Sequence, residues 1–147
     1  MLMSTVSLKR KSSGLITKYI RYFEDPMSIL SAARKGLKPE AVFDFITLSG
    51  FPTSTIEKLL NKSIQTFNNY RDNETSLDPT TSEKLLRLFS LYQRGSIVFG
   101  TVEDFNKWIA EPAFGLGNQP PQHLLDTITG IQLVDEELAR IEYGDIA

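Results

Sequence analysis

The chain has 147 residues, 41% of them hydrophobic, so it can bury the core of one ordinary domain or of two very small ones. The chain has no cysteine and one histidine, which excludes disulfides and zinc sites built from cysteine or histidine. It also has no run of about 18 apolar residues. We therefore expect a soluble, unprocessed cytoplasmic chain with no membrane partner. The net charge of −2 divides into +3 over residues 1–80 and −5 over residues 81–147. This division favours nucleic acid as a partner of the first part and a protein as a partner of the second. An uneven surface without functional meaning explains the division equally well.

The chain begins with a polar segment that is basic and rich in serine, and short helices follow it. We expect residues 1–14 to form a mobile tail, because they have little to bury. Asp25-Pro26 is an N-cap followed by proline at the first helical position, and Gly36 ends this first helix. Pro39 opens a second helix, which Gly50 ends.

The segment from Phe51 to Arg71 predicts a helix, a tight turn and a second helix. Ser54 and Glu57 have the spacing of a capping box before the first helix, and residues 61–63 interrupt the apolar pattern before the second. The apolar residues have the spacing needed to hold the two helices together, and they are Ile56, Leu59, Leu60, Ile64 and Phe67.

The longest helix is expected to follow, with Thr80 and Glu83 repeating the capping-box spacing and Gly100 ending it. Thr101 and Asp104 indicate another helix start. One face of this further helix carries Val102, Phe105, Trp108 and Ile109. We interpret Trp108 as a core residue or as a support beneath an interface, because a single tryptophan in a small helical protein is more often buried than exposed.

Prolines and glycines set the backbone of a loop over residues 111–122. We expect a short helix after it that Gly130 closes, and a last helix that ends at Gly144. No segment alternates with period two over the length of a strand, so the fold class is all-α. We divide the chain into a tail, a helical DNA-binding domain over 15–100 and a C-terminal domain over 101–147.

The second helix of the pair at 51–71 carries side chains of the types that read DNA. In a helix-turn-helix this helix enters the major groove, where Gln and Asn pair with adenine, Arg pairs with guanine, and Ser, Thr or Lys bind phosphates. The outward side chains assigned to DNA are Lys62, Ser63, Gln65, Thr66, Asn68, Asn69 and Arg71. A solvated polar helix in an ordinary bundle explains the same composition equally well.

The C-terminal third carries an ordered series of spaced residues that resembles a known family. The series runs through Phe105, Trp108, Pro112, Phe114, Leu116-Gly117, Pro120, Leu124-Leu125-Asp126-Thr127, Gly130, Val134 and Leu138 to Arg140-Ile-Glu-Tyr-Gly144. It resembles the toxin-binding region of the Xre/MbcA/ParS antitoxins. The resemblance extends upstream to about residue 25 through the helix-turn-helix and the Leu-rich helix that follows it. It departs from the family at Gln65-Thr66-Phe67 and Asn69-Tyr70, where members often have an Arg-Thr-Leu start and paired arginines, so DNA affinity and base preference do not carry over.

The resemblance implies a partner and a mechanism. Antitoxins of this family are generally encoded beside a RES-domain toxin that degrades NAD, and they place the C-terminal segment at the toxin's active-site cleft. An acidic end (Glu142, Asp145 and the terminal carboxylate) suits a site built for a dinucleotide's phosphates. Tyr143 suits a pocket in the partner. The residues assigned to toxin binding are Phe114, Leu116, Leu138, Ile141, Glu142, Tyr143, Gly144 and Asp145.

Other functions have less support in the sequence. No phosphate loop, nucleophile motif, metal spacing or paired-carboxylate motif is present, so we expect neither an enzyme nor a cofactor. His123 has no candidate catalytic partner. The closest alternative is a helix-turn-helix repressor that binds operator DNA as a homodimer and has no toxin partner. The two interpretations overlap, because such antitoxins commonly repress their own operon.

Overall fold

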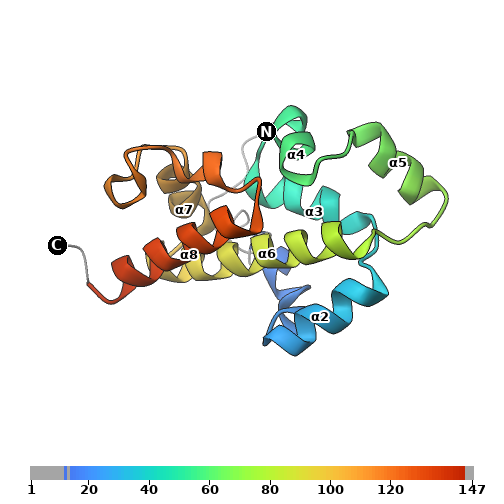
Figure 1. The fold of residues 1–147 in the computed structure, drawn as a ribbon, viewed down its shortest axis with the longest axis horizontal. Helices are drawn as coiled ribbons and strands as arrows, with labels where there is room; N and C mark the ends of the chain where they lie inside the picture. Colours follow the sequence, from blue (N-terminus) through green and yellow to red (C-terminus); the bar gives the residue numbers. More distant parts are fainter. Residues whose placement is uncertain (1–11, 13, 145–147) are drawn as a thin grey trace.

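The computed structural model describes residue 12 and residues 14–144, and over these residues the fold is all-α, as predicted (Figure 1). The α-helices are α2 (Pro26–Lys35), α3 (Glu40–Ser49), α4 (Thr53–Leu60), α5 (Ile64–Asp72), α6 (Pro79–Phe99), α7 (Val102–Ile109) and α8 (Ile128–Glu142). Three short 3-10 helices are η1 (Ile20–Tyr22), η2 (Phe114–Leu116) and η3 (Pro121–Leu124). The mobile tail predicted for residues 1–14 lies almost wholly outside the described residues.

Most helix ends are set by residues that the sequence singles out. The Asp25 side chain accepts a hydrogen bond from the backbone N–H of Ser28 at 2.8 Å, and Gly36 ends α2 at a φ of 88°. Gly50 ends α3 in the left-handed conformation. Thr101 caps α7 by accepting from the backbone N–H of Asp104. These predictions are confirmed, because each rests on a residue type with a local structural role.

Three predicted helix ends are wrong. Helix α4 begins at Thr53 without a side-chain cap, so Ser54 is not an N-cap. Helix α6 begins at Pro79, and its cap is Asp78 rather than Thr80. Gly130 does not close a short helix but lies inside α8, because Thr127 caps α8 by accepting from the Gly130 N–H. The capping-box spacing places the first two starts one or two positions too late, and the glycine rule mistakes a residue in the first turn of α8 for a helix end.

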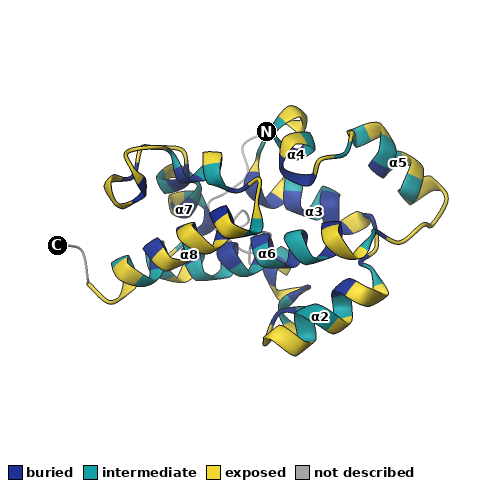
Figure 2. Ribbon diagram, viewed as in Figure 1, coloured by how far each residue is buried: buried dark blue, intermediate teal, exposed yellow. Residues whose placement is uncertain are grey.

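Helix α6 lies at the centre of the molecule, and α2, α3, α7 and α8 pack against it (Figure 1). Burial follows this arrangement, because α6 is largely buried or partly buried while the outer turns of α2, α5 and α8 are exposed (Figure 2). The apolar core is continuous from Ile16 to Leu138 and crosses the domain boundary predicted at residue 100.

Aromatic side chains join the two parts of the core. The Phe45 ring of α3 meets the rings of Phe89 and Tyr92 edge to face, and Tyr92 meets Phe105 of α7 at 4.8 Å between ring centres. The buried Tyr92 hydroxyl donates to Asn106 Oδ1 at 2.7 Å, and burial raises the pKa of this hydroxyl well above its ordinary value. It therefore stays protonated and links α6 to α7.

Candidate functional site

Helices α4 and α5 form a helix-turn-helix whose turn is fixed by one backbone conformation and two hydrogen bonds. Asn61 ends α4 at a φ of 56°, which asparagine tolerates better than most residues. The Ser63 side chain caps α5 by accepting from the backbone N–H of Thr66 at 3.1 Å. The Glu57 carboxylate of α4 accepts from the backbone N–H of Ile64 at 2.7 Å. The N-terminus of α5 is therefore held in one orientation against α4.

The apolar residues predicted to hold this pair together do so. Ile56, Leu59, Leu60 and Phe67 are buried, and Ile64 is partly buried against the same core. The opposite face of α5 is polar. Its exposed side chains among the predicted set are Ser63, Gln65, Asn69 and Arg71.

The polar face of α5 is internally hydrogen-bonded. Gln65 Nε2 donates to Asn69 Oδ1 at 3.1 Å, one helical turn apart. Arg71 Nη2 donates to Asn68 Oδ1 at 3.0 Å, and the guanidinium lies 4.3 Å from the centre of the Phe43 ring. These contacts hold in place the side chains that the sequence assigns to DNA, and a base edge would have to replace some of the contacts.

Lys62 lies at the turn but is engaged inside the protein. Its Nζ lies 3.1 Å from Asp78 Oδ1 and donates to Thr81 Oγ1 at 3.3 Å. Burial raises the pKa of Asp78, but hydrogen bonds from Thr81 and Lys62 outweigh this effect and leave the pKa below its ordinary value. The pair joins the turn to the start of α6, so a phosphate would have to compete for this ammonium group.

The second candidate surface is a compact loop that presents Phe114. A β-bridge joins Ala113 to Gln119, and the Ala113 carbonyl also accepts from the N–H groups of Leu116 and Asn118 at 3.0 Å. Leu116 is buried beneath the loop, whereas Phe114 is 85% exposed. The loop therefore offers an aromatic ring on a backbone that is already ordered.

A close contact seats this loop on α8. A Cβ placed on Gly115 would lie 2.2 Å from Glu137 Oε2, so a larger residue there would require the Glu137 side chain to move. Glu137 is buried and accepts from Arg140 through Nε at 3.1 Å and Nη2 at 2.6 Å. These two hydrogen bonds from Arg140 satisfy the buried carboxyl group beneath the loop.

The end of α8 is tied to α6. Arg94 of α6 forms ion pairs with Asp135 at 2.7 Å and with Glu142 at 3.4 Å. Beyond this clamp Tyr143 is 79% exposed. Gly144 follows with a φ of 69°. The C-terminal surface thus carries two exposed aromatic residues, Phe114 and Tyr143, on anchored backbone.

Known protein families match the two parts of the chain that carry these surfaces. The antitoxin Xre-like helix-turn-helix domain matches residues 28–90, and the antitoxin Xre/MbcA/ParS C-terminal toxin-binding domain matches residues 94–144. The chain belongs to the Xre/MbcA/ParS antitoxins. The Prs ADP-ribosylating antitoxin of Sphingobium sp. (strain YBL2) is 27% identical over 135 residues, which span 86% of this chain and 85% of the relative. A toxin–antitoxin role follows, with a toxin and DNA as the partners that the two domains indicate.

In this antitoxin the structure corrects two of the residues assigned to toxin contact. Leu138 is fully buried and Leu116 is 8% exposed, so neither side chain is available to a partner that docks on the surface. Both support the loop and α8 from beneath. Ile141 is partly buried, and Glu142 and Gly144 are exposed beside Tyr143. Asp145 lies outside the described residues.

The sequence reasoning missed two anchoring residues of the antitoxin. Glu137 lies on the same face of α8 as the buried residues Val134 and Leu138. Its place in this i, i+3, i+4 pattern could have indicated a buried carboxylate. Lys84 donates to the carbonyls of Leu59 at 2.8 Å and Asp126 at 2.6 Å, which joins α4 to the segment before α8. Burial lowers the pKa of Lys84, and no local pattern predicts its two partners.

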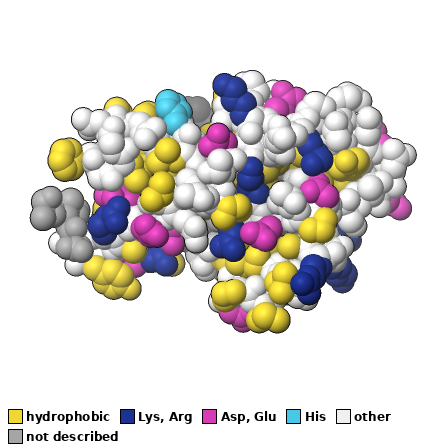
Figure 3. Space-filling model, in the orientation of Figure 1, with side chains coloured by type: hydrophobic (Ala, Val, Ile, Leu, Met, Phe, Trp, Pro, Cys, Tyr) yellow, Lys and Arg dark blue, Asp and Glu magenta, His cyan; other side chains and the backbone are white. Residues whose placement is uncertain are grey.

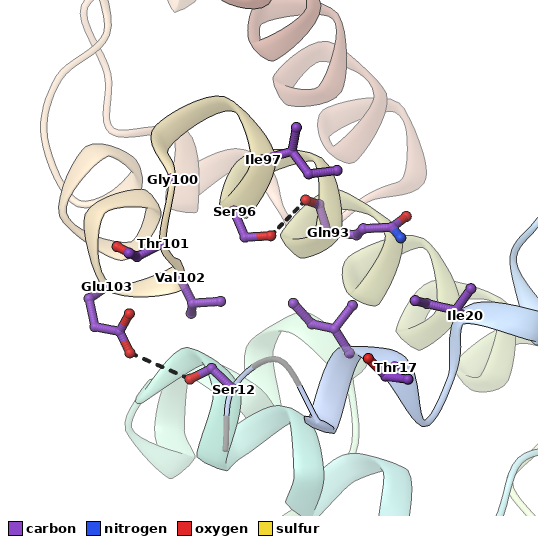
Figure 4. Close-up of a pocket in the computed structure, with 11 residues that line it drawn as sticks. Ser12, Thr17, Ile20, Gln93, Ser96, Ile97, Gly100, Thr101, Val102 and Glu103 are labelled. Carbon is purple, nitrogen blue, oxygen red and sulfur yellow. Dashed lines mark hydrogen bonds between the residues drawn. The ribbon is translucent and has the colours of Figure 1, made fainter. Parts of the chain in front are cut away.

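A cavity of about 490 Å³ lies away from both sets of predicted residues (Figure 4). The N-terminal segment around Ile16 and Ile20 forms one side, and the junction of α6 and α7 forms the other. Ser12 donates to Glu103 Oε1 at 3.5 Å across it. Within residues 12 and 14–144, no group of three or more acidic or histidine side chains is placed to hold a metal ion. None of the helices described there is long and apolar enough to cross a membrane.

Proposed function

We propose that this antitoxin neutralises a RES-type toxin that degrades NAD by covering the toxin's active site with its C-terminal segment. The observation that supports the proposal best is the pair of exposed aromatic residues, Phe114 and Tyr143, on the ordered backbone of the toxin-binding domain. Large aromatic side chains that fill a partner's pockets provide most of the binding energy in many interfaces. A partner surface that accepts both would bury the α8 end between them.

The charge of the C-terminal segment fits an active site of this kind. Glu142 and Asp145 lie on either side of Tyr143-Gly144 in the sequence. A site that binds NAD must hold its pyrophosphate, and cationic groups that do so would also attract carboxylates. Glu142 is already paired with Arg94 at 3.4 Å, so the toxin would compete for a weakly held carboxylate.

Removal of Tyr143 to Ala147 tests the covering mechanism. The truncated antitoxin should still fold, because α8 ends at Glu142, but toxin-dependent loss of NAD should return in a mixture of the purified proteins. Tyr143→Phe, which retains the ring, serves as the matched control and should still neutralise. Full neutralisation by the truncated chain would contradict the proposal.

The Sphingobium relative supports a second candidate for the toxin's chemistry. Its name associates that protein with ADP-ribosylation, a reaction that consumes NAD as the donor. A toxin that transfers ADP-ribose to a protein would offer a similar NAD cleft to the antitoxin. NAD radiolabelled in its adenylate phosphate distinguishes the two reactions. Both release nicotinamide, so label transferred to protein indicates ADP-ribosylation, whereas label found only in small products indicates NAD degradation.

We propose further that the antitoxin represses its own operon as a homodimer, with α5 in the major groove. The exposed amides of Gln65 and Asn69 support this part, because they suit adenine. A single motif of this size binds weakly, and two copies on a palindrome bind more tightly. Binding to the DNA upstream of the gene, measured together with sedimentation of the complex, tests both statements.

The alternative is a homodimeric repressor that has no toxin partner. Co-expression with the neighbouring open reading frame separates the two functions. A toxic neighbour that this protein rescues supports neutralisation. A harmless neighbour, together with tight operator binding, supports repression alone.

A further inference from the structure

The positive charges of the helix-turn-helix region divide into engaged and free groups. Lys18 pairs with Asp44 at 2.9 Å and Glu40 at 3.0 Å, and Lys62 pairs with Asp78. Arg87 pairs with Glu83, and Lys84 binds two backbone carbonyls. These ammonium and guanidinium groups already have partners within the protein, and a DNA phosphate would have to displace them.

The helices of the motif itself contribute no net charge. Helix α4 carries Glu57 and Lys58, and α5 carries Arg71 and Asp72. Phosphate neutralisation supplies most non-specific DNA affinity and a large share of specific affinity. A protein that inserts α5 into the major groove therefore needs cations from elsewhere in the molecule.

Three free cations gather where α2 ends. We call Arg34, Lys35 and Lys38 the basic turn. All three are exposed, and none has an ion pair or a side-chain hydrogen bond within the described part of the chain. A hollow of about 290 Å³ beside them is lined by Lys35, Lys38 and Arg21 among others. Figure 3 shows Lys and Arg side chains gathered at this end of α2, at the lower right of the molecule.

The basic turn lies against the segment that leaves α5. The backbone N–H of Leu77 donates to the carbonyl of Leu37 at 2.8 Å, and a Cβ on Gly36 would lie 2.5 Å from the Leu77 carbonyl oxygen. The Leu37 N–H donates to Ser82 Oγ at 2.9 Å. Leu77 follows the end of α5 by five residues, so these contacts fix the basic turn beside the exit of the proposed recognition helix.

We propose that the basic turn is a second DNA-contact surface, which binds backbone phosphates at the edge of the groove that α5 enters. This inference rests on the proposed DNA-binding function. Phosphates line both edges of the major groove, which is about 12 Å wide, so a helix in the groove brings neighbouring turns close to a phosphate row. The α5 amides then select the sequence, while Arg34, Lys35 and Lys38 provide affinity that is independent of it.

A charge-removal variant tests the basic turn on the full-length protein. The variant carries Arg34→Gln, Lys35→Gln and Lys38→Gln. These changes remove the positive charges but keep long polar side chains. The probe is a short random-sequence DNA duplex, titrated by fluorescence anisotropy over a range of salt concentrations. We expect the slope of log K against log salt to become shallower by about 0.9 for each lost contact, and affinity at about 0.1 M salt to fall by up to roughly 10²-fold.

A matched control separates a local contact from the effect of total charge. Lys107→Gln, Gln119→Glu and Gln132→Glu lower the net charge by the same amount at exposed positions of the toxin-binding domain. This control should retain the salt slope of the unchanged protein. Thermal melting of both variants checks that the helices remain folded, because cations in the last turn of α2 also favour that helix.

The outcomes distinguish this proposal from the one on which it rests. If the unchanged protein binds neither the random duplex nor the DNA upstream of its gene, the DNA-binding function fails. If it binds with a salt slope that the basic-turn variant retains, or that the control loses equally, only the basic-turn proposal is overturned. A parallel titration uses vesicles of phosphatidylcholine and phosphatidylserine. If the basic-turn variant loses vesicle binding but binds DNA as well as the unchanged protein does, the basic turn contacts anionic lipid, and the proposal is overturned as well.

Discussion

The helix-turn-helix region and the toxin-binding region expose opposite kinds of surface. On α5 the outward face is polar, and its amides and guanidinium are hydrogen-bonded to one another. In the C-terminal region Phe114 and Tyr143 are 85% and 79% exposed, which is costly for a surface that stays in water. Polar groups that are already satisfied can exchange partners at little net cost, so they suit selection among similar DNA sites. Exposed aromatic rings gain most from a single well-fitting pocket, so they suit tight binding to one protein.

Loss of an aromatic anchor should have the largest effect. Phe114→Ala is expected to weaken toxin binding by about 2–4 kcal/mol, or roughly 30- to 1000-fold, because a buried aromatic hot spot is removed. Isothermal titration with the purified toxin measures this loss. DNA binding by the same variant should be unchanged. A loss below about threefold would show that Phe114 is not an anchor.

A methyl group at Gly130 should strain the backbone packing of the C-terminal region. A Cβ there would lie 1.6 Å from the Leu124 carbonyl oxygen, so Gly130→Ala forces the backbone before α8 to move. We expect a loss of about 3 kcal/mol in the free energy of unfolding, measured by urea denaturation. Gly50→Ala, at a φ of 67° with no atom within 4 Å, is the comparison in the helix-turn-helix region and should cost about 1 kcal/mol. Equal costs would contradict the steric argument.

Removal of the two exposed amides should change which DNA is bound rather than whether it is bound. Gln65→Ala with Asn69→Ala is expected to reduce the discrimination between operator and altered operator by about 1–3 kcal/mol per lost base contact. Competition binding with a set of single-base operator variants measures it. Toxin neutralisation should survive, and an unchanged sequence preference would rule out α5 as the recognition helix.

The smallest predicted effect concerns Asp78, which caps α6 and pairs with Lys62. Asp78→Ala should cost about 1 kcal/mol through loss of the cap, while Asp78→Asn keeps a capping oxygen and should cost less. Because folding lowers the pKa of Asp78, its contribution is complete above about pH 4 and is lost as the pH falls through the folded-state value. Urea denaturation near neutral pH and near pH 3 should therefore show a smaller acid-induced loss for Asp78→Asn than for the unchanged protein.

The sequence alone predicts the helices of both regions, and it is less accurate at their ends. Gly36 and Gly50 are predicted correctly because a helix stop is a local property of the backbone. The same rule predicts a helix end at Gly130, and this prediction is wrong. Glycine is required there by a close approach of two backbone segments, which no local sequence pattern indicates. Local rules therefore identify an unusual residue better than they identify its cause.

Candidate contact residues show the same limit. Phe114 and Leu116 lie two positions apart in a loop with no regular period, and one is exposed while the other is buried. Only the tertiary arrangement decides between them, because the bridge from Ala113 to Gln119 turns the loop over α8. Likewise, Lys62 is a plausible phosphate ligand in the sequence, and its ion pair with Asp78 becomes visible only when the turn packs on α6.

The position of α6 has a consequence for how antitoxins of this kind can exchange parts. The two matched domains meet between residues 90 and 94, inside a 21-residue helix whose Tyr92 is fully buried against both. A hybrid that joins the first half of one antitoxin to the second half of another would have its seam in this helix. Tyr92 contacts Phe45 in the first half and Phe105 in the second. A hybrid would therefore need compatible residues at all three positions to keep this packing. New combinations of the two halves would have to evolve through coordinated changes on both sides of the junction.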